Sequence, residues 1–328
     1  MNHEAHTSDN QPIKAGGDPY FTASHLEGFL MATLREQRAS RRWKIFFRLA
    51  FFLVFLAFTI GLFLDPRAQK TGTGPHTALI NLEGEIALES PASAKDLNKA
   101  LQAAFENSNT KGVILRINSP GGSPVQSSMV FNEIRRLRAL HPQIPLYVVV
   151  EELCASGAYF IAAAADKIYV NPASLIGSIG VLMNGFGLTE IMKKTGVERR
   201  LLTAGENKGM LDPFSPLSDK HRDHVQAMLS DIHTQFITAV KQGRGKRLVN
   251  AEPEIFSGLI YTGSKGVAVG LADEFGSVDS VAREVIQAPD LMDFSPHENV
   301  AERLAKKLGA SFGVGLVQAI TNKGVTLR

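Results

Sequence analysis

Cysteine is almost absent from this chain of 328 residues, in which Cys154 is the single example. No internal disulfide can form, so a small secreted fold held together by bridges is excluded. Charge is also modest, because Asp, Glu, Lys and Arg make up 20% of the residues and the formal net charge is only +3. General nucleic-acid binding needs a concentrated basic surface, which this balance does not favour. The 44% of hydrophobic residues suffices for one large core or two modest ones.

Histidine is missing from a long internal stretch, between Pro142 and Lys220. A serine nucleophile in that stretch would have no histidine nearby in sequence to take its proton. His221 and His224 follow one helical turn apart, a spacing that can hold a metal ion, but no obvious cluster of further ligands accompanies them. We therefore interpret the pair as part of a solvated helix face, and we predict no metal site there.

A long apolar run is present near the N-terminus, at residues 45–64 (IFFRLAFFLVFLAFTIGLFL), with Arg48 as its one charge. About 20 apolar residues cross a bilayer as a helix, and an arginine near the end can place its charged group at the interface. A buried core helix would show a polar face, and a cleaved signal peptide normally begins close to the first residue. The run therefore predicts a retained transmembrane helix in contact with membrane lipid.

Flanking charge predicts how this helix is oriented. Basic residues gather before the run or at its start and are few after it: Arg35, Arg38, Arg41, Arg42, Lys44 and Arg48, against Arg67 and Lys70. The positive-inside rule keeps the first part in the cytoplasm and exports the rest, to the periplasm in a Gram-negative bacterium. The predicted organisation is a cytoplasmic tail (1–44), an inner-membrane helix (45–64), a linker (65–76), a main domain (77–290) and a C-terminal extension (291–328).

The exported part alternates between strand-like and helix-like segments. Runs rich in β-branched residues at 77–86, 112–119 and 144–150 alternate with segments of helical periodicity at 93–107 and 125–140. Ser93 is the expected N-cap of the first of these helical segments. Such alternation predicts an α/β fold with a parallel sheet covered by flanking helices. The continuous apolar run at 146–150 suits a central strand that is buried on both faces. A long amphipathic helix is also predicted, at 219–241.

Two glycine-containing turns follow predicted strands. One is NSPGG, at 118–122, and the other is ASG, at 155–157. Sites in parallel α/β sheets form beyond the carboxyl ends of the strands, so the turns lie side by side if their strands are neighbours. The amides of Gly122 and Gly157 can then converge as an oxyanion hole, with Ser156 as the nucleophile. From these residues alone, a purely structural turn is the alternative.

Two other candidate nucleophiles lie close by in the sequence. Ser178 stands between glycines, but its G-S-x-G spacing differs from the G-x-S-x-G of hydrolase elbows, so we interpret it as a turn or a pocket wall. Cys154 ends the third predicted strand, where a lone cysteine is far more often part of the core.

A lysine is the best remaining proton acceptor for Ser156, because burial can keep a lysine amine uncharged. The histidine-free stretch holds Lys167, Lys193, Lys194, Lys208 and Lys220. Lys208 differs from the others because it lies in a glycine-flanked loop, TAGENKGMLDPF, without helical periodicity, so the backbone can present it inward. A solvated loop lysine is an equally good interpretation of that sequence.

Four ordered segments resemble the signal peptide peptidase A family of bacterial membrane serine proteases. They are ILRINSPGG (114–122), CASGAYFIAAAADKIYVNPASLIGSIGV (154–181), TAGENKGMLDPFSP (203–216) and YTGSKGVAVGLADEFG (261–276). The similarity covers about residues 77–285 and looks like the short form of the family, with one catalytic unit.

The resemblance implies a Ser–Lys dyad. Ser156 matches the nucleophile of an A-S-G-G-Y type motif, with Ala158 in place of the usual second glycine, and Lys208 matches the general base of a G-x-x-K loop. The amides of Gly122 and Gly157 match the oxyanion donors. The resemblance also implies a crotonase- and Clp-protease-like fold and a ring or dome of subunits, in which the lysine of one subunit reaches the serine of a neighbour.

The resemblance further implies the substrate class, namely remnant signal peptides and other extended apolar peptides. Ser174, Ser178 and Val181 are then candidates for lining the substrate pocket, and neither a cofactor nor a nucleic acid is implied. Three alternatives stay open: a related membrane protease that acts on membrane-scaffold proteins, an acyl-CoA enzyme of the crotonase type, and a non-catalytic membrane assembly factor.

Overall fold

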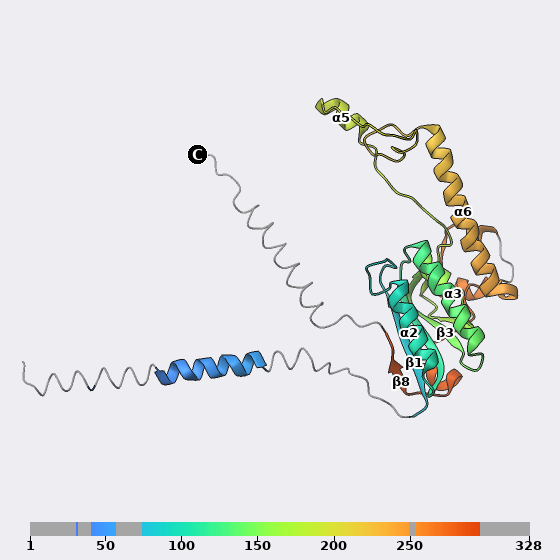
Figure 1. The fold of residues 1–328 in the computed structure, drawn as a ribbon. Helices are drawn as coiled ribbons and strands as arrows, with labels where there is room; N and C mark the ends of the chain where they lie inside the picture. Colours follow the sequence, from blue (N-terminus) through green and yellow to red (C-terminus); the bar gives the residue numbers. More distant parts are fainter. Residues whose placement is uncertain (1–30, 32–40, 57–73, 249–252, 296–328) are drawn as a thin grey trace, which may run out of the picture. The chain divides into compact units, whose positions relative to one another are not determined.

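The computed structural model describes residues 31, 41–56, 74–248 and 253–295 (Figure 1). The chain divides into two compact units, Met1–Pro66 and Arg67–Arg328. In the first unit, residues 41–56 are helical. Within the described residues, no helix combines the length and the apolar character needed to cross a membrane. The second part of the predicted span, residues 57–64, lies outside the described residues, as do most of the linker and of the C-terminal extension.

The second unit is built on an eight-stranded sheet, with the order β6-β5-β3-β2-β1-β8 along its main path. The strands of that path are β1 (His76–Glu83), β2 (Thr110–Ser119), β3 (Leu146–Ala155), β5 (Leu175–Gly177), β6 (Ile260–Thr262) and β8 (Leu291–Asp293). Beside it, β4 (Lys167–Val170) pairs with β3 and with β7 (Glu274–Phe275). Among these strands only the β5–β6 pair is antiparallel. The predicted α/β fold with flanking helices is confirmed.

Helices pack against one face of this sheet more fully than against the other. The α-helices of this unit are α2 (Ala94–Glu106), α3 (Pro124–Leu140), α4 (Gly157–Ala162), α5 (Thr189–Thr195), α6 (Asp219–Arg244), α7 (Gly263–Ala268) and α8 (Val278–Ser280). Two 3-10 helices, η1 (Gly245–Arg247) and η2 (Pro253–Phe256), and one π-helix, η3 (Val281–Ile286), accompany them. The main core contains the inward faces of α2, α3 and α4 with alternate residues of β1, β2 and β3. A smaller cluster on the opposite face packs Ile114 and Val149 against Val281 and Ala282.

Local capping signals in the sequence set where α2 and α3 begin. The hydroxyl of Ser93 accepts a hydrogen bond from the amide of Asp96, and the hydroxyl of Ser123 accepts one from the amide of Gln126. Each bond satisfies a backbone N–H that the first turn of a helix leaves without a partner. The predicted cap at Ser93 is confirmed.

β3 is the central strand of the unit. One edge pairs with β2 along its length, while the other edge is divided between β4, at residues 147–149, and β5, at residues 153–155. Leu146, Val148 and Val150 are buried in the main core, and Val149 is buried in the cluster on the opposite face. Burial on both faces, as the sequence predicted, fixes the register of the strand that leads to Ser156.

α6 is buried only toward its C-terminal end. Its buried residues are Phe236, Ala239, Val240 and Arg244, and the ring centroid of Phe236 lies 5.0 Å from that of Phe160 in α4. Residues 182–218, which we call the arm, contain no fully buried residue. Figure 1 shows α5 of the arm toward the N-terminal end of α6, away from the sheet.

A buried ion pair joins the C-terminal end of α6 to the sheet. Arg244 is 1% exposed, and its guanidinium donates hydrogen bonds to both carboxylate oxygens of Asp273, at 2.8 and 3.0 Å. It also donates to the carbonyl oxygen of Gly270, at 3.0 Å. Asp273 in turn accepts a hydrogen bond from the amide of Ile168 in β4, at 2.7 Å. Removing either partner would leave a charge in the interior without its counter-ion.

Asp273→Ala should lower the free energy of unfolding by about 3–5 kcal/mol, because the guanidinium of Arg244 would stay buried without its carboxylate. The matched control is Glu284→Ala, which removes the exposed partner of Arg283 and should change the free energy by less than about 1 kcal/mol. Urea unfolding followed by far-UV circular dichroism measures both values. Similar losses in the two variants would contradict a stabilising role for the buried pair.

Candidate active site

The two glycine turns lie against each other because β2 and β3 are paired neighbours. Their pairing places Ser119 opposite Cys154 at the carboxyl ends of the strands. A Cβ atom built on Gly121 would lie 2.6 Å from the nitrogen of Gly157 and 2.8 Å from the Cβ of Ser156. Real Cβ atoms do not come so close to other atoms, so only glycine fits at position 121. The predicted contact between the two turns is present.

The loop after β1 supports the first of these turns from behind. The amide of Ile86 donates to the carbonyl oxygen of Gly121, and the amide of Ser123 donates to the carbonyl oxygen of Ile86, each at 2.8 Å. A Cβ on Gly122 would lie 2.2 Å from that Ile86 oxygen, and φ at Gly122 is +146°. The backbone of Gly122 is therefore fixed by its neighbours in a conformation that requires glycine.

Ser156 has an unusual backbone conformation, with φ +53° and ψ −125°. Its amide donates to the carbonyl oxygen of Gly177, at 2.9 Å, and its carbonyl accepts from the amide of Phe160, at 3.0 Å. The strand therefore ends and α4 begins at this residue. A conformation of this kind costs about 1–3 kcal/mol and persists only where the surroundings impose it. The half-buried side chain does not cap α4, which leaves its hydroxyl available.

Two backbone amides next to Ser156 are available for a ligand. Neither the N–H of Gly122 nor that of Gly157 donates a hydrogen bond to any other residue in the described part of the chain. The nitrogen of Gly122 would lie only 3.2 Å from a Cβ built on Gly157, so the two backbones are in contact. The structure thus brings a serine hydroxyl and two unpaired amides together, which are the elements of a nucleophile with an oxyanion hole.

The three predicted pocket residues lie in two different places. Ser178, with φ +51°, and the half-buried Val181 follow the end of β5, whose Gly177 pairs with Ala155 directly before the nucleophile. Ser174 is buried, and its hydroxyl donates to the carbonyl oxygen of Glu151. It lines a separate cavity of about 750 Å³ that does not include Ser156. Ser178 and Val181 therefore follow the strand that pairs with β3 directly before the nucleophile, whereas Ser174 lines the separate cavity.

Lys208 is exposed and lies in the arm. The adjacent residues attach its loop to the first turn of α6: the carboxylate of Glu206 pairs with Lys220 at 2.7 Å, and the amide oxygen of Asn207 lies 3.3 Å from Nε2 of His221. Hydrogen bonding to Lys220 lowers the pKa of Glu206. No interaction joins Lys208 to the nucleophile among the described residues.

The length of α6 explains this separation. About 24 Å of helix lies between Lys220, beside the lysine loop, and Phe236, which packs on α4 (1.5 Å per residue). A lysine side chain is much shorter than that distance. One chain on its own, in this conformation, therefore contributes the nucleophile and the amides but does not bring Lys208 to them.

Cys154 lies in the core, as the sequence predicted, and His221 and His224 lie on α6. Cys154 is fully buried in the main core, and burial raises the pKa of its thiol well above its usual range. His221 is half-buried and His224 is exposed in the first turns of α6. Across the described residues there is no group of three or more side chains that could hold a metal ion.

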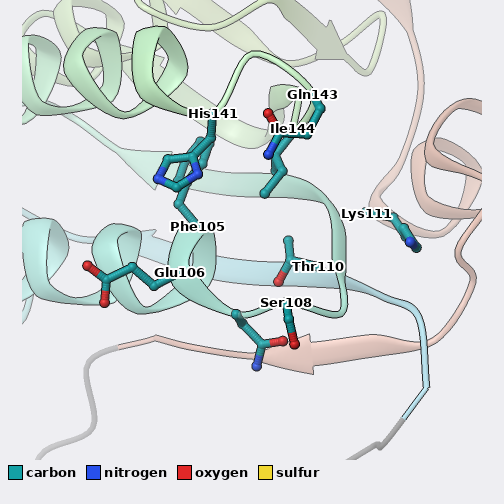
Figure 2. Close-up of a pocket in the computed structure, with 9 residues that line it drawn as sticks. Phe105, Glu106, Ser108, Thr110, Lys111, His141, Gln143 and Ile144 are labelled. Carbon is teal, nitrogen blue, oxygen red and sulfur yellow. The ribbon is translucent and has the colours of Figure 1, made fainter.

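A different pocket, of about 590 Å³, lies at the other end of the strands from Ser156 (Figure 2). It is lined by the C-terminal ends of α2 and α3, including Glu106 and His141, and by Thr110 at the start of β2. Figure 2 shows the ring of His141 beside Phe105, and the two ring centroids are 5.8 Å apart. Because the strands are parallel, this pocket is at their amino ends and away from Ser156.

The chain matches a family model described as peptidase family S49 over residues 138–291, a range that contains Ser156 and Lys208. The Na+/H+ antiporter NhaA of Brucella melitensis is 41% identical over 203 residues, which are 62% of this chain and 27% of that protein. The chain thus spans about a quarter of the length of the first curated relatives that it matches.

Two further relatives carry provisional protease names. A protein of Methanocaldococcus jannaschii that is provisionally named a protease is 31% identical over 221 residues, which are 66% of this chain and 70% of that protein. A protein of Enterococcus faecium that is provisionally named signal peptide peptidase SppA is 32% identical over 188 residues, which are 56% of this chain and 54% of that protein.

Iodoacetamide should leave Cys154 unmodified in the folded protein at pH 8, because burial shields the thiol and raises its pKa. After denaturation in guanidinium chloride, the same reagent should add one label per chain, since no other cysteine is present. Intact-mass spectrometry distinguishes the two states. Labelling of the folded protein at the rate of a free thiol would show that Cys154 is accessible and would reopen its role as a nucleophile.

Proposed function

The chain belongs to peptidase family S49, and we propose that it is a serine endopeptidase with Ser156 as its nucleophile and Lys208 as its general base. The observation that carries this proposal is the position of Ser156, held in a strained conformation beside the unpaired amides of Gly122 and Gly157. A serine is rarely placed in this way without a chemical role. The crotonase- and Clp-protease-like fold remains part of the proposal.

In the proposed reaction, Oγ of Ser156 attacks the carbonyl carbon of a peptide bond, and the uncharged amine of Lys208 takes the hydroxyl proton. The carbonyl oxygen becomes an oxyanion, which accepts hydrogen bonds from the amides of Gly122 and Gly157. The tetrahedral intermediate then breaks down, and the ammonium of Lys208 gives its proton to the departing amine. Water activated by the same amine finally hydrolyses the acyl-enzyme and restores Ser156.

We propose that a second copy of the chain completes each active site. Lys208 is separated from the serine of its own chain by most of the length of α6. The arm that carries it also presents large apolar side chains to solvent, among them Leu182, Phe186 and Leu202 at 83, 81 and 96% exposure. Apolar surface of this extent usually marks an interface. A ring or dome in which each arm lies on the neighbouring copy would bring Lys208 to that neighbour's Ser156.

The proposed substrates are extended apolar peptides, above all signal peptides that remain in the membrane after processing. The name of the Enterococcus faecium relative supports this class. A membrane helix at residues 45–64, with the N-terminus in the cytoplasm, would hold the catalytic domain on the periplasmic face of the inner membrane, close to such peptides. Ser178 and Val181 are candidates for contacting the bound peptide because they follow the strand that pairs with β3.

A fluorophosphonate probe should label the wild-type chain once, and Ser156→Ala should abolish the label and lower the hydrolysis of an apolar peptide by at least about 10³-fold. Ser128→Ala, which removes an exposed hydroxyl from α3, is the matched control and should keep both properties. Mass spectrometry of the labelled chain and a fluorogenic peptide assay give the two readouts. Full labelling of the Ser156→Ala chain would refute the assignment of the nucleophile.

Mixing the two inactive variants tests whether sites are shared between copies. Ser156→Ala and Lys208→Ala should each be inactive alone, but co-expression should restore about one quarter of the wild-type activity, since half of the serines and half of the lysines are intact and pair at random. Activity of the mixture near zero, while both variants still assemble with each other, would place the lysine and the serine of each site in the same chain.

A further inference from the structure

A groove of about 750 Å³ lies on the sheet face that α2 and α3 do not cover. Its floor contains Leu79, Arg116 and Val149, from β1, β2 and β3 in turn. Its walls are the loops at 171–175 and 276–279, and Leu291 of β8 lies at one end. Both Leu175 and Leu291 are exposed, so the groove offers apolar surface to whatever occupies it.

The rim of this groove is acidic. Glu151, Glu152 and Asp279 line it together with one basic residue, Arg116. The guanidinium of Arg116 is already paired with the carboxylates of Glu83 and Glu151, each at 3.3 Å. Glu152 and Asp279 are exposed, and neither has an ion-pair partner in the part of the chain that the structure describes. The groove therefore suits an occupant that has both apolar and basic side chains.

The chain leaves the C-terminal end of β8 beside this groove. The amide of Phe294 donates to the carbonyl oxygen of Leu79, at 2.8 Å, and the amide of Asn81 donates to the hydroxyl of Ser295, at 2.9 Å. Asn81 is paired with Arg116 in the register of β1 and β2, so the chain continues from beside the groove floor. Neighbouring strands are about 4.8 Å apart, and three or four extended residues cross from β1 to β3.

The sequence that follows Ser295 matches the chemistry of the groove. Residues 296–328 contain five basic and two acidic residues, so this segment carries a net charge of +3 with His297 neutral. Its first part places Val300, Leu304 and Leu308 four residues apart, with Arg303 and Lys307 directly before two of them. Basic residues thus stand beside regularly spaced apolar ones, over a length that can reach Glu152 from the end of β8.

We propose that residues 296–310 bind in the groove of their own chain. The side chains of Arg303 and Lys307 then lie against Glu152 and Asp279, and the apolar residues cover Val149 and the exposed leucines of the groove. This segment would complete the cover of the sheet face that η3 leaves open, directly behind the strand that leads to Ser156. The inference does not depend on the proposed catalytic roles, because none of its residues belongs to the active site.

Cross-linking in the full-length chain, purified in detergent, tests the proposal. Cysteines are introduced at an exposed groove position and in the segment, as Ala173→Cys with Gly309→Cys, while the buried Cys154 stays in place. A short bis-maleimide should join the pair within one chain, with a yield at least about tenfold above that of the control Leu140→Cys with Gly309→Cys. Leu140 is exposed at the end of α3, which packs on the opposite face of the sheet.

Peptide mapping by mass spectrometry and non-reducing gels identify the products. A cross-link between two chains would assign the groove to the segment of a second copy, and a yield equal to that of the control would leave the groove without this occupant. Either result overturns the proposal.

A charge exchange tests the ionic contact separately. Glu152→Lys should lower the intramolecular yield by about threefold to tenfold, and the addition of Lys307→Glu should restore it, since opposite charges would again face each other. Restoration excludes a general folding defect as the cause of the loss. An unchanged yield in Glu152→Lys would show that the acidic rim does not hold the segment.

Discussion

The close approach of two backbone turns, residues 121–122 and 156–157, is the constraint on which the site depends. A side chain at Gly121 would overlap the backbone of Gly157, and one at Gly122 would overlap Ile86. The approach exists only while β2 and β3 keep their register, because a slip of one residue would turn every side chain to the other face of the sheet. The buried core on both faces of β3 therefore positions the candidate nucleophile as directly as the turns do.

The helix that follows the nucleophile, α4, is held by buried contacts, because all of its residues are buried. The hydroxyl of Tyr159 donates to the carbonyl oxygen of Leu271, at 2.7 Å, and burial raises the pKa of that hydroxyl, so it stays protonated as a donor. Asp273, two residues after Leu271, accepts the hydrogen bonds of the Arg244 guanidinium at the end of α6. The helix that carries the arm is thus anchored to the same interior that holds Ser156. Phe236 of α6 also packs on Phe160 of α4, the helix that begins directly after Ser156.

Sequence patterns predicted the features that arise from local chemistry, namely the cap at Ser93, the strand–helix alternation and the two neighbouring turns. The apolar run at 146–150 covers only the first half of β3, because Glu151 and Glu152 follow it where the strand changes partner from β4 to β5. The Arg244–Asp273 ion pair could not be predicted, because it joins residues 29 positions apart. The exposure of the arm could not be predicted either, because it depends on which surfaces the folded chain leaves uncovered.

The two halves of the proposed site differ in how they are held. On the nucleophile side, Ser156 and Ser178 both have positive φ, and hydrogen bonds to the carbonyls of Gly177 and Leu259 fix them in place. This strain is offset by the surrounding buried core, so that half is preorganised within a single chain. Lys208, in contrast, is exposed on an arm without buried residues. If each lysine serves the serine of a neighbouring copy, an unassembled chain has an oxyanion site but no base. Peptide hydrolysis would then begin only on assembly, because the nucleophile and the base would come from different copies.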